Sequence, residues 1–177
     1  MRGSWTGLTA LLALAATNGS AARAAETATV APACATTNAA LPPELAGWLK
    51  MSAMQAGTQG AALPRAEAGV GYTLMLAPAE TLSSIAPPGK PAAAGSYGGM
   101  LSLDIARAGT YVVALGAGAW VDVVKNGQPL ASIAHGHGPA CSTIRKTVEF
   151  ALDPGHYTIQ LAGNAEPTLD FLIARKP

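Results

Sequence analysis

Two of the three histidines and one of the two cysteines lie close together in the sequence. They are His135, His137 and Cys141, and the third histidine, His156, follows further along the chain. Side chains two positions apart on an extended segment point to the same side, so His135 and His137 could bind one metal ion. Imidazole and thiolate are ligands of iron, copper and zinc. One hypothesis is therefore a divalent transition-metal site at His135, His137 and His156, with Cys141 as a further possible ligand.

The alternative is that this segment is a structural loop without a cofactor. Gly136, Gly138 and Pro139 favour a tight, exposed turn, and histidines on such loops commonly face water. The two cysteines help to decide between the metal site and the structural loop. In an oxidising compartment they can form only one disulfide, Cys34–Cys141. A disulfide there would remove the thiolate from any metal.

No other catalytic pattern is found in the sequence, so the catalytic residues stay unknown. The chain has no G-x-S-x-G elbow, no H-E-x-x-H pair and no glycine-rich phosphate loop. The acidic residues are scattered singly, which gives no paired-carboxylate site. Arg145 and Lys146 are interpreted as a solvated strand edge that discourages pairing between sheets.

The amino end has the layout of a secretory signal peptide over residues 1–24. Arg2 is followed by an apolar run from Leu8 to Ala16, and Ala22-Arg23-Ala24 fits the cleavage pattern. The run is too short for a membrane anchor. We therefore expect a periplasmic or secreted protein with no transmembrane segment after cleavage.

The charge balance argues against a nucleic-acid partner. Loss of Arg2 and Arg23 would lower the basic residues from 11 to 9, against 10 acidic residues. Such a chain has no basic stripe for a phosphate backbone. Charged residues make up 12% of the sequence, where about 25% is usual. This weakly charged surface favours an envelope partner or a small ligand.

Residues 25–69 have no sustained periodicity and are expected to form an irregular arm. Pro43 could open a short helix near 43–50, with Leu45, Trp48 and Leu49 on one face. Trp48 is the expected anchor of this arm.

From residue 70 onward the sequence alternates between apolar and polar residues. Tyr72, Leu74 and Leu76 share one face of the first expected strand. Asn126-Gly127 is a strong hairpin signal, and Pro129 places the return strand toward an edge. Further strands are expected over 101–105, 143–152 and 168–174.

A near-repeat supports the same architecture. Gly109-Thr110-Tyr111 and Gly155-His156-Tyr157 each open an alternating strand. The tyrosines are typical of the tyrosine corner, in which the hydroxyl bonds to nearby backbone. In the second copy His156, Thr158 and Gln160 are expected on a solvated face. We predict an all-β protein, an antiparallel β-sandwich or jelly roll of about seven to eight strands over residues 70–177.

Two resemblances follow from these motifs. Residues 96–176, with both Gly-x-Tyr entries and the Asn126-Gly127 hairpin, resemble the pre-peptidase C-terminal type of β-sandwich appended to secreted bacterial enzymes. Residues 42–48, 132–139 and 141–146 resemble a group of short exported bacterial proteins sometimes labelled homogentisate 1,2-dioxygenase.

That label implies a cupin-type enzyme that holds Fe(II) with two histidines and a glutamate. His135 and His137 match the histidine pair, and 154–156 resembles the second cupin motif with compressed spacing. Cys141 stands where the glutamate is expected, so the carboxylate of the triad is missing. The leading expectation is a non-catalytic binding or envelope-associated module without a cofactor. The alternative is a cupin-like metal-dependent protein of dioxygenase type.

Overall fold

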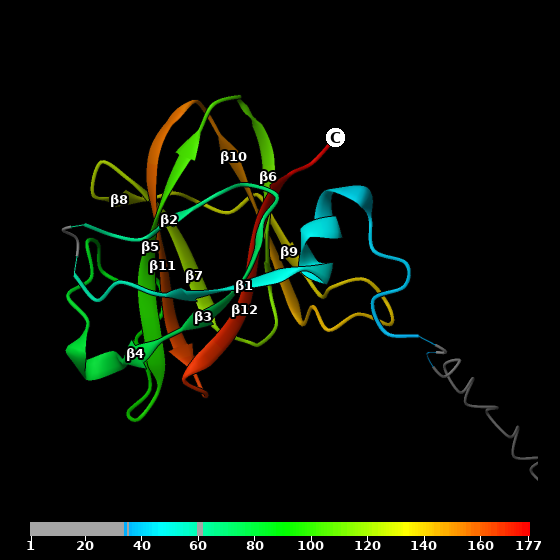
Figure 1. Cartoon of the computed structure of the whole chain (residues 1–177). Coiled ribbons are helices and arrows are strands. Elements are labelled where there is room, and N and C mark those ends of the chain that lie inside the picture. Colours follow the sequence, from blue (N-terminus) through cyan, green and yellow to red (C-terminus); the bar gives the residue numbers. More distant parts are fainter. Residues whose placement is uncertain (1–33, 35, 60–61) are drawn as a thin grey trace, which may run out of the picture. The chain divides into compact units, whose positions relative to one another are not determined.

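Two β-sheets packed face to face make up the part of the chain that the computed structural model describes, residues 34, 36–59 and 62–177 (Figure 1). The expected signal peptide lies outside these residues. In order across the first sheet the strands are β1 (Met51–Gln55), β3 (Gly71–Met75), β12 (Thr168–Arg175), β6 (Gly109–Leu115), β10 (Lys146–Leu152) and β9 (Ala134–Gly136). The second sheet has the order β2 (Arg65–Ala66), β5 (Tyr97–Ile105), β11 (Gly155–Asn164), β7 (Trp120–Lys125) and β8 (Gln128–Pro129), with β4 (Ala77–Pro78) also paired to β5.

The all-β sandwich is confirmed, with more strands than expected. The additional ones are β1, β2, β4 and β9, which are between two and five residues long. Their burial does not alternate regularly, as in β9, where all three residues are exposed. Strands this short span too few residues to show a clear alternation in the sequence, and they are stabilised by pairing with a neighbouring strand.

Most strand pairs are antiparallel as predicted, but two pairings are parallel and were not expected. β1 runs parallel to β3, and β2 runs parallel to β5. Between β1 and β3 the chain crosses to the other sheet, where it forms β2, and then returns. A connection of that length allows a parallel pair, whereas a tight hairpin would force an antiparallel one.

The expectation of an irregular arm over 25–69 is also corrected, since β1 and β2 lie in it. The expected short helix is present as a 3-10 helix, η1 (Pro43–Leu49), and a second one, η2 (Ala79–Thr81), follows β4. Trp48 is buried and its Nε1 donates to Thr143 Oγ1 at 2.7 Å. Thr143 was expected in a strand, but β10 begins only at Lys146.

The arm is also tied to the sandwich by a Cys34–Cys141 disulfide, as predicted. Asn38 reinforces this connection, because its backbone N–H donates to the Cys141 carbonyl at 2.8 Å and its side-chain Oδ1 accepts from Thr143 N at 2.8 Å.

Among the described residues, none of the helices has the length and apolar character needed to cross a membrane.

The alternation of the long strands places their apolar side chains between the sheets. Leu101, Leu103, Ile159 and Leu161 are all at most 2% exposed. At the entry to β6 the Tyr111 hydroxyl donates to the Arg107 carbonyl at 2.9 Å. Tyr157 makes the equivalent bond to Asp153 at 2.7 Å. Both expected tyrosine corners are therefore formed.

The turn between β7 and β8 has the predicted form. Asn126 and Gly127 have φ of 52° and 74°, the left-handed conformation that a type I′ turn needs at both positions. Pro129 lies in the terminal strand of its sheet, where its missing N–H breaks no ladder.

The outer face of β11 differs from the expectation of a solvated surface. Gln160 is 3% exposed, because the loop after η2 covers it. Its Oε1 accepts from the backbone of Ile85 at 2.7 Å and Ala86 at 3.0 Å, and its Nε2 donates to the Ala86 carbonyl. A sequence pattern of one strand cannot show that a distant loop folds over it.

The first prediction concerns the tyrosine corner. Tyr111→Phe removes the hydroxyl that bonds the Arg107 carbonyl and should lower the free energy of unfolding by about 1 kcal/mol in urea denaturation. Tyr97→Phe is the matched control, since the Tyr97 hydroxyl makes no hydrogen bond within the described residues. Equal effects of the two substitutions would contradict the role of the corner.

The second prediction concerns the disulfide, whose cysteines are 107 residues apart. Replacing both Cys34 and Cys141 by serine should lower the free energy of unfolding by about 4 to 5 kcal/mol, because the denatured chain regains loop entropy. Thiol titration of the denatured, unreduced protein should find no free cysteine. Unfolding curves that are the same with and without a reductant would refute the bond.

Candidate functional site

The structure places the three histidines of the metal hypothesis apart rather than in one centre. His135 lies in β9 at the end of the first sheet, opposite Val148, and His137 follows that strand; both are exposed. His156 lies in β11 of the other sheet, and Cys141 is bonded to Cys34. Within residues 34, 36–59 and 62–177, no three His, Cys, Asp or Glu side chains are grouped so that they could hold a metal ion. The geometry gives the metal hypothesis no support.

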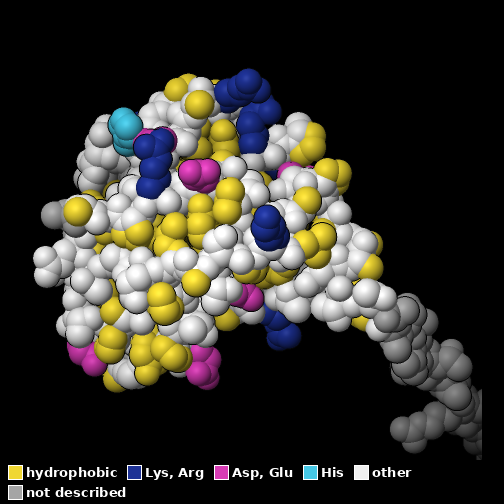
Figure 2. All heavy atoms as spheres, in the orientation of Figure 1, with side chains coloured by type: hydrophobic (Ala, Val, Ile, Leu, Met, Phe, Trp, Pro, Cys, Tyr) yellow, Lys and Arg dark blue, Asp and Glu magenta, His cyan; other side chains and the backbone are white. Residues whose placement is uncertain are grey.

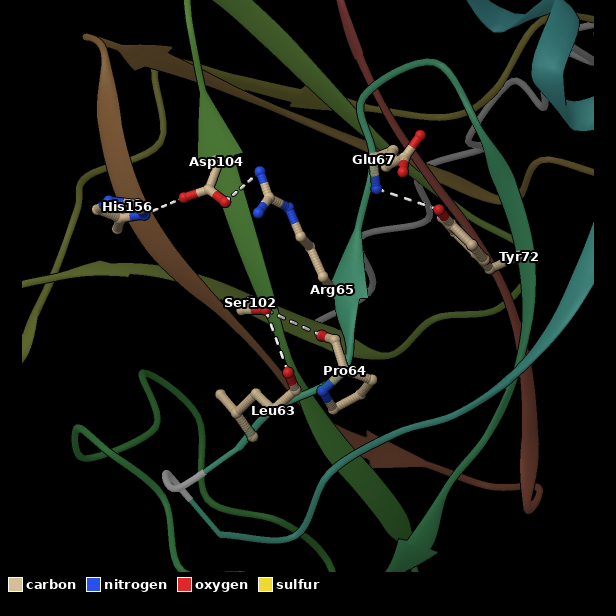
Figure 3. A network of polar contacts seen from close by, with 8 residues as sticks. All are labelled: Leu63, Pro64, Arg65, Glu67, Tyr72, Ser102, Asp104 and His156. Atoms are coloured by element: carbon tan, nitrogen blue, oxygen red, sulfur yellow. Dashed lines mark hydrogen bonds and ion pairs between the residues drawn. The ribbon is translucent and has the colours of Figure 1, made fainter.

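His156 instead belongs to a network of polar contacts that links β2, the end strand of the second sheet, to β5 and β11 (Figure 3). Its Nδ1 is paired with Asp104 of β5, and the other oxygen of Asp104 binds Arg65 of β2 at 2.5 Å. Ser102 extends the network, because its hydroxyl donates to the carbonyls of Leu63 and Pro64. Exposed ion pairs of this kind contribute about 0 to 1 kcal/mol each to stability, so the network stabilises only the pairing of these strands.

A cleft opens on the side of the sandwich where both sheets end, at β8 and β9. The chain crosses between the sheets there through residues 130–133, and the cleft has a volume of about 460 Å³. Its floor is apolar, since it is formed by core side chains of both sheets together with the crossing segment. The apolar lining residues are Val121, Leu130, Ala131, Val148 and Phe150.

Few polar side chains line this cleft, and they gather at Trp120 of β7. Lys146, at the start of β10, lies over the Trp120 ring at 5.2 Å and donates to the Ala119 carbonyl at 2.9 Å. The Trp120 indole N–H donates to Asp122 Oδ1 at 2.9 Å. The other oxygen of Asp122 accepts from the backbone of Gly89 at 3.1 Å. His135 and Ser132 complete the polar lining.

A second, smaller cavity of about 260 Å³ shares Trp120 and Lys146 with the cleft. Lys90 and Pro91, from the loop that covers the second sheet, form its other wall. Trp120 and Lys146 therefore stand where the two cavities adjoin, with an apolar floor on one side and a second lysine on the other.

The environment of Lys146 disfavours its charged form. Burial lowers the pKa of its ammonium below the usual value, repulsion from Lys90 lowers the pKa further, and the Asp122 carboxylate raises it in part. A half-buried cation held beside another cation is an arrangement that an anion would stabilise.

Charged side chains are few in this chain, at 12% of the sequence. Figure 2 shows one face of the molecule, on which Lys, Arg, Asp and Glu side chains are scattered among uncharged and apolar groups. Lys90 and Lys146 line one cavity together, so two cations lie close to each other there.

Comparisons of the chain with protein-family models, with curated proteins and with solved structures found no match. The two resemblances stated from the sequence therefore stay predictions.

The residues that line the cleft were not singled out as a site by the sequence. Arg145 and Lys146 were interpreted as a solvated strand edge, but β9 pairs with β10, so β10 is not an edge strand, and Lys146 is partly buried. One signal was available in the strand 120–125, where Trp120 and Asp122 alternate with valines. When an aromatic and an acidic residue share one face of a strand, that face is expected to be partly covered, neither buried in the core nor fully exposed to water.

The third prediction concerns the pKa of Lys146. Because this pKa is lower in the folded chain than in the unfolded one, the unfolded chain binds more protons between the two values, and stability rises with pH through that window. The free energy of unfolding of the wild type should therefore rise relative to that of Lys146→Met between about pH 7 and pH 10.

Denaturation in urea at both pH values measures this difference. Lys125→Met, which removes an ammonium beside Tyr157 and outside the cleft, is the matched control and should keep the gain of the wild type. A gain that persists in Lys146→Met would assign it to another group.

Proposed function

We propose that the chain is an exported, non-catalytic binding module, and that the cleft between β7 and β10 receives a small, mainly apolar ligand. The single observation that supports this most is that side chains of the core line the cleft. Phe150 is 2% exposed and Val121 is 5% exposed, yet both line a cavity of about 460 Å³. Small-molecule sites are usually concave and apolar, with a few fixed polar groups that orient the ligand.

The polar groups of the cleft have the character of orienting groups. Asp122 is engaged through both oxygens, by Trp120 and by Gly89, so it fixes the indole ring rather than facing the cavity as a free acid. The ring in turn supports the Lys146 ammonium. This chain of contacts gives a rigid wall, and rigid walls reduce the entropy lost on binding.

Export is supported by two independent features. Residues 1–24 have the composition and order of a cleavable leader. The Cys34–Cys141 disulfide belongs to an oxidising compartment such as the periplasm or the cell exterior. A binding module there would meet small ligands from the surroundings or from the envelope.

The fourth prediction tests the cleft with a neutral apolar probe. N-phenyl-1-naphthylamine should bind the purified protein and gain fluorescence. Ala131→Trp fills the cleft from the crossing segment and should weaken this binding about tenfold, because the large ring takes the place of the probe.

Ala134→Trp is the matched control for the fluorescence titration. Ala134 is exposed like Ala131 and is close to it in sequence, but it does not line the cleft. Equal probe affinities in the two variants, or no binding to the wild type, would overturn the proposed function.

A further inference from the structure

We propose that the ligand of this cleft is a monocarboxylate with an apolar body, whose carboxylate binds Lys146 beside Trp120 while the body lies on the apolar floor. This inference rests on the proposed function and adds the chemical class of the ligand.

The charge around Lys146 favours an anionic ligand. Lys90 and Lys146 line one small cavity, and Asp122 is the acidic group that acts on Lys146. Two cations and one anion leave one positive charge. A ligand with a single negative charge would neutralise it, whereas a neutral ligand would leave the repulsion between the lysines in place.

The hydrogen-bonding capacity of the Lys146 ammonium favours a carboxylate. Lysine has three N–H donors. The described residues offer the Lys146 ammonium one acceptor, the Ala119 carbonyl at 2.9 Å. The remaining donors match the two oxygens of a carboxylate, and hydrogen bonds between ionised partners are stronger than neutral ones.

The position of the Lys146 ammonium relative to the apolar floor favours a ligand with its charge at one end. Lys146 lines the cleft together with Val148 and Phe150, which follow it at alternate positions in β10. The charge therefore stands at one end of the apolar floor. A ligand with its charge at one end of an apolar chain or ring fits this order, and a sugar or another ligand that is polar throughout does not.

Trp120 fixes the position of the Lys146 ammonium. The Lys146 ammonium lies 5.2 Å from the Trp120 ring, which is held by Asp122. A lysine side chain otherwise loses much rotamer freedom when it pairs with an anion. Here the packing on Trp120 and the bond to Ala119 restrict the side chain before a ligand arrives.

The fifth prediction compares octanoate with 1-octanol, which share the same chain and differ in charge. Dissociation constants are measured near neutral pH by displacement of N-phenyl-1-naphthylamine and by calorimetry. The wild type should bind octanoate about tenfold more tightly than octanol, because only octanoate pairs with the ammonium. In Lys146→Met the ratio of the two constants should fall to about one, while Lys146→Arg should keep part of the preference.

Lys125→Met is the matched control, because it removes an ammonium from the Tyr157 side, outside the cleft, and should keep the full preference. Lys90→Met removes the exposed second lysine and should reduce the preference about twofold. Near-ultraviolet circular dichroism checks that each variant is folded.

Equal affinity of the wild type for octanoate and octanol overturns this inference and leaves the proposed function standing. A preference for octanoate that persists in folded Lys146→Met overturns it as well. Failure of both compounds to bind overturns this inference, and the proposed function falls with it only if N-phenyl-1-naphthylamine does not bind either.

Discussion

Leu101, Ile159 and Ile173 are fully buried between the two sheets, and the apolar layer that they belong to holds every other part of the structure in place. Burial of this kind contributes about 25 cal/mol for each Å² of apolar surface removed from water. It also fixes the register of the strands, since a shift by one residue would turn these side chains outward. The tyrosine corners then set where β6 and β11 enter the layer.

The same constraint explains where the cleft lies. The layer closes fully where long strands face one another, but the sheets end at β8 and β9, which have two and three residues. The chain must cross from one sheet to the other there, and the crossing segment leaves part of the floor uncovered. Lys146 and Trp120 stand at this opening, so the chemistry of the cleft is a consequence of how the two sheets end.

Much of the fold could be predicted from the sequence because its signals are local. The alternation of Tyr72, Leu74 and Leu76, the Asn126-Gly127 turn and the two Gly-x-Tyr entries each act within a few residues. The parallel pairing of β1 with β3 could not be predicted in this way, because it depends on the crossing of the chain between the sheets. The cover over Gln160 is likewise a contact across 75 residues of sequence.

The candidate site was less accessible to sequence reasoning for the same reason. The spacing of His135 and His137 suggests a metal site, but such a site depends on which strands bring its ligands together. His135 lies in β9 and His156 in β11, and these strands belong to different sheets. Lys146 carries no motif. Its significance comes from Trp120, Ala119 and Lys90, which lie in other segments and approach it only in the folded chain.

Nuclear magnetic resonance of the nitrogen-15-labelled protein during a titration with octanoate tests the central claim most directly. The indole N–H signal of Trp120 should shift with the amides of β10, while the indole signal of Trp48, which is bonded to Thr143 away from the cleft, should stay in place. Shifts confined to residues outside the cleft, or no shift at all, would contradict the account.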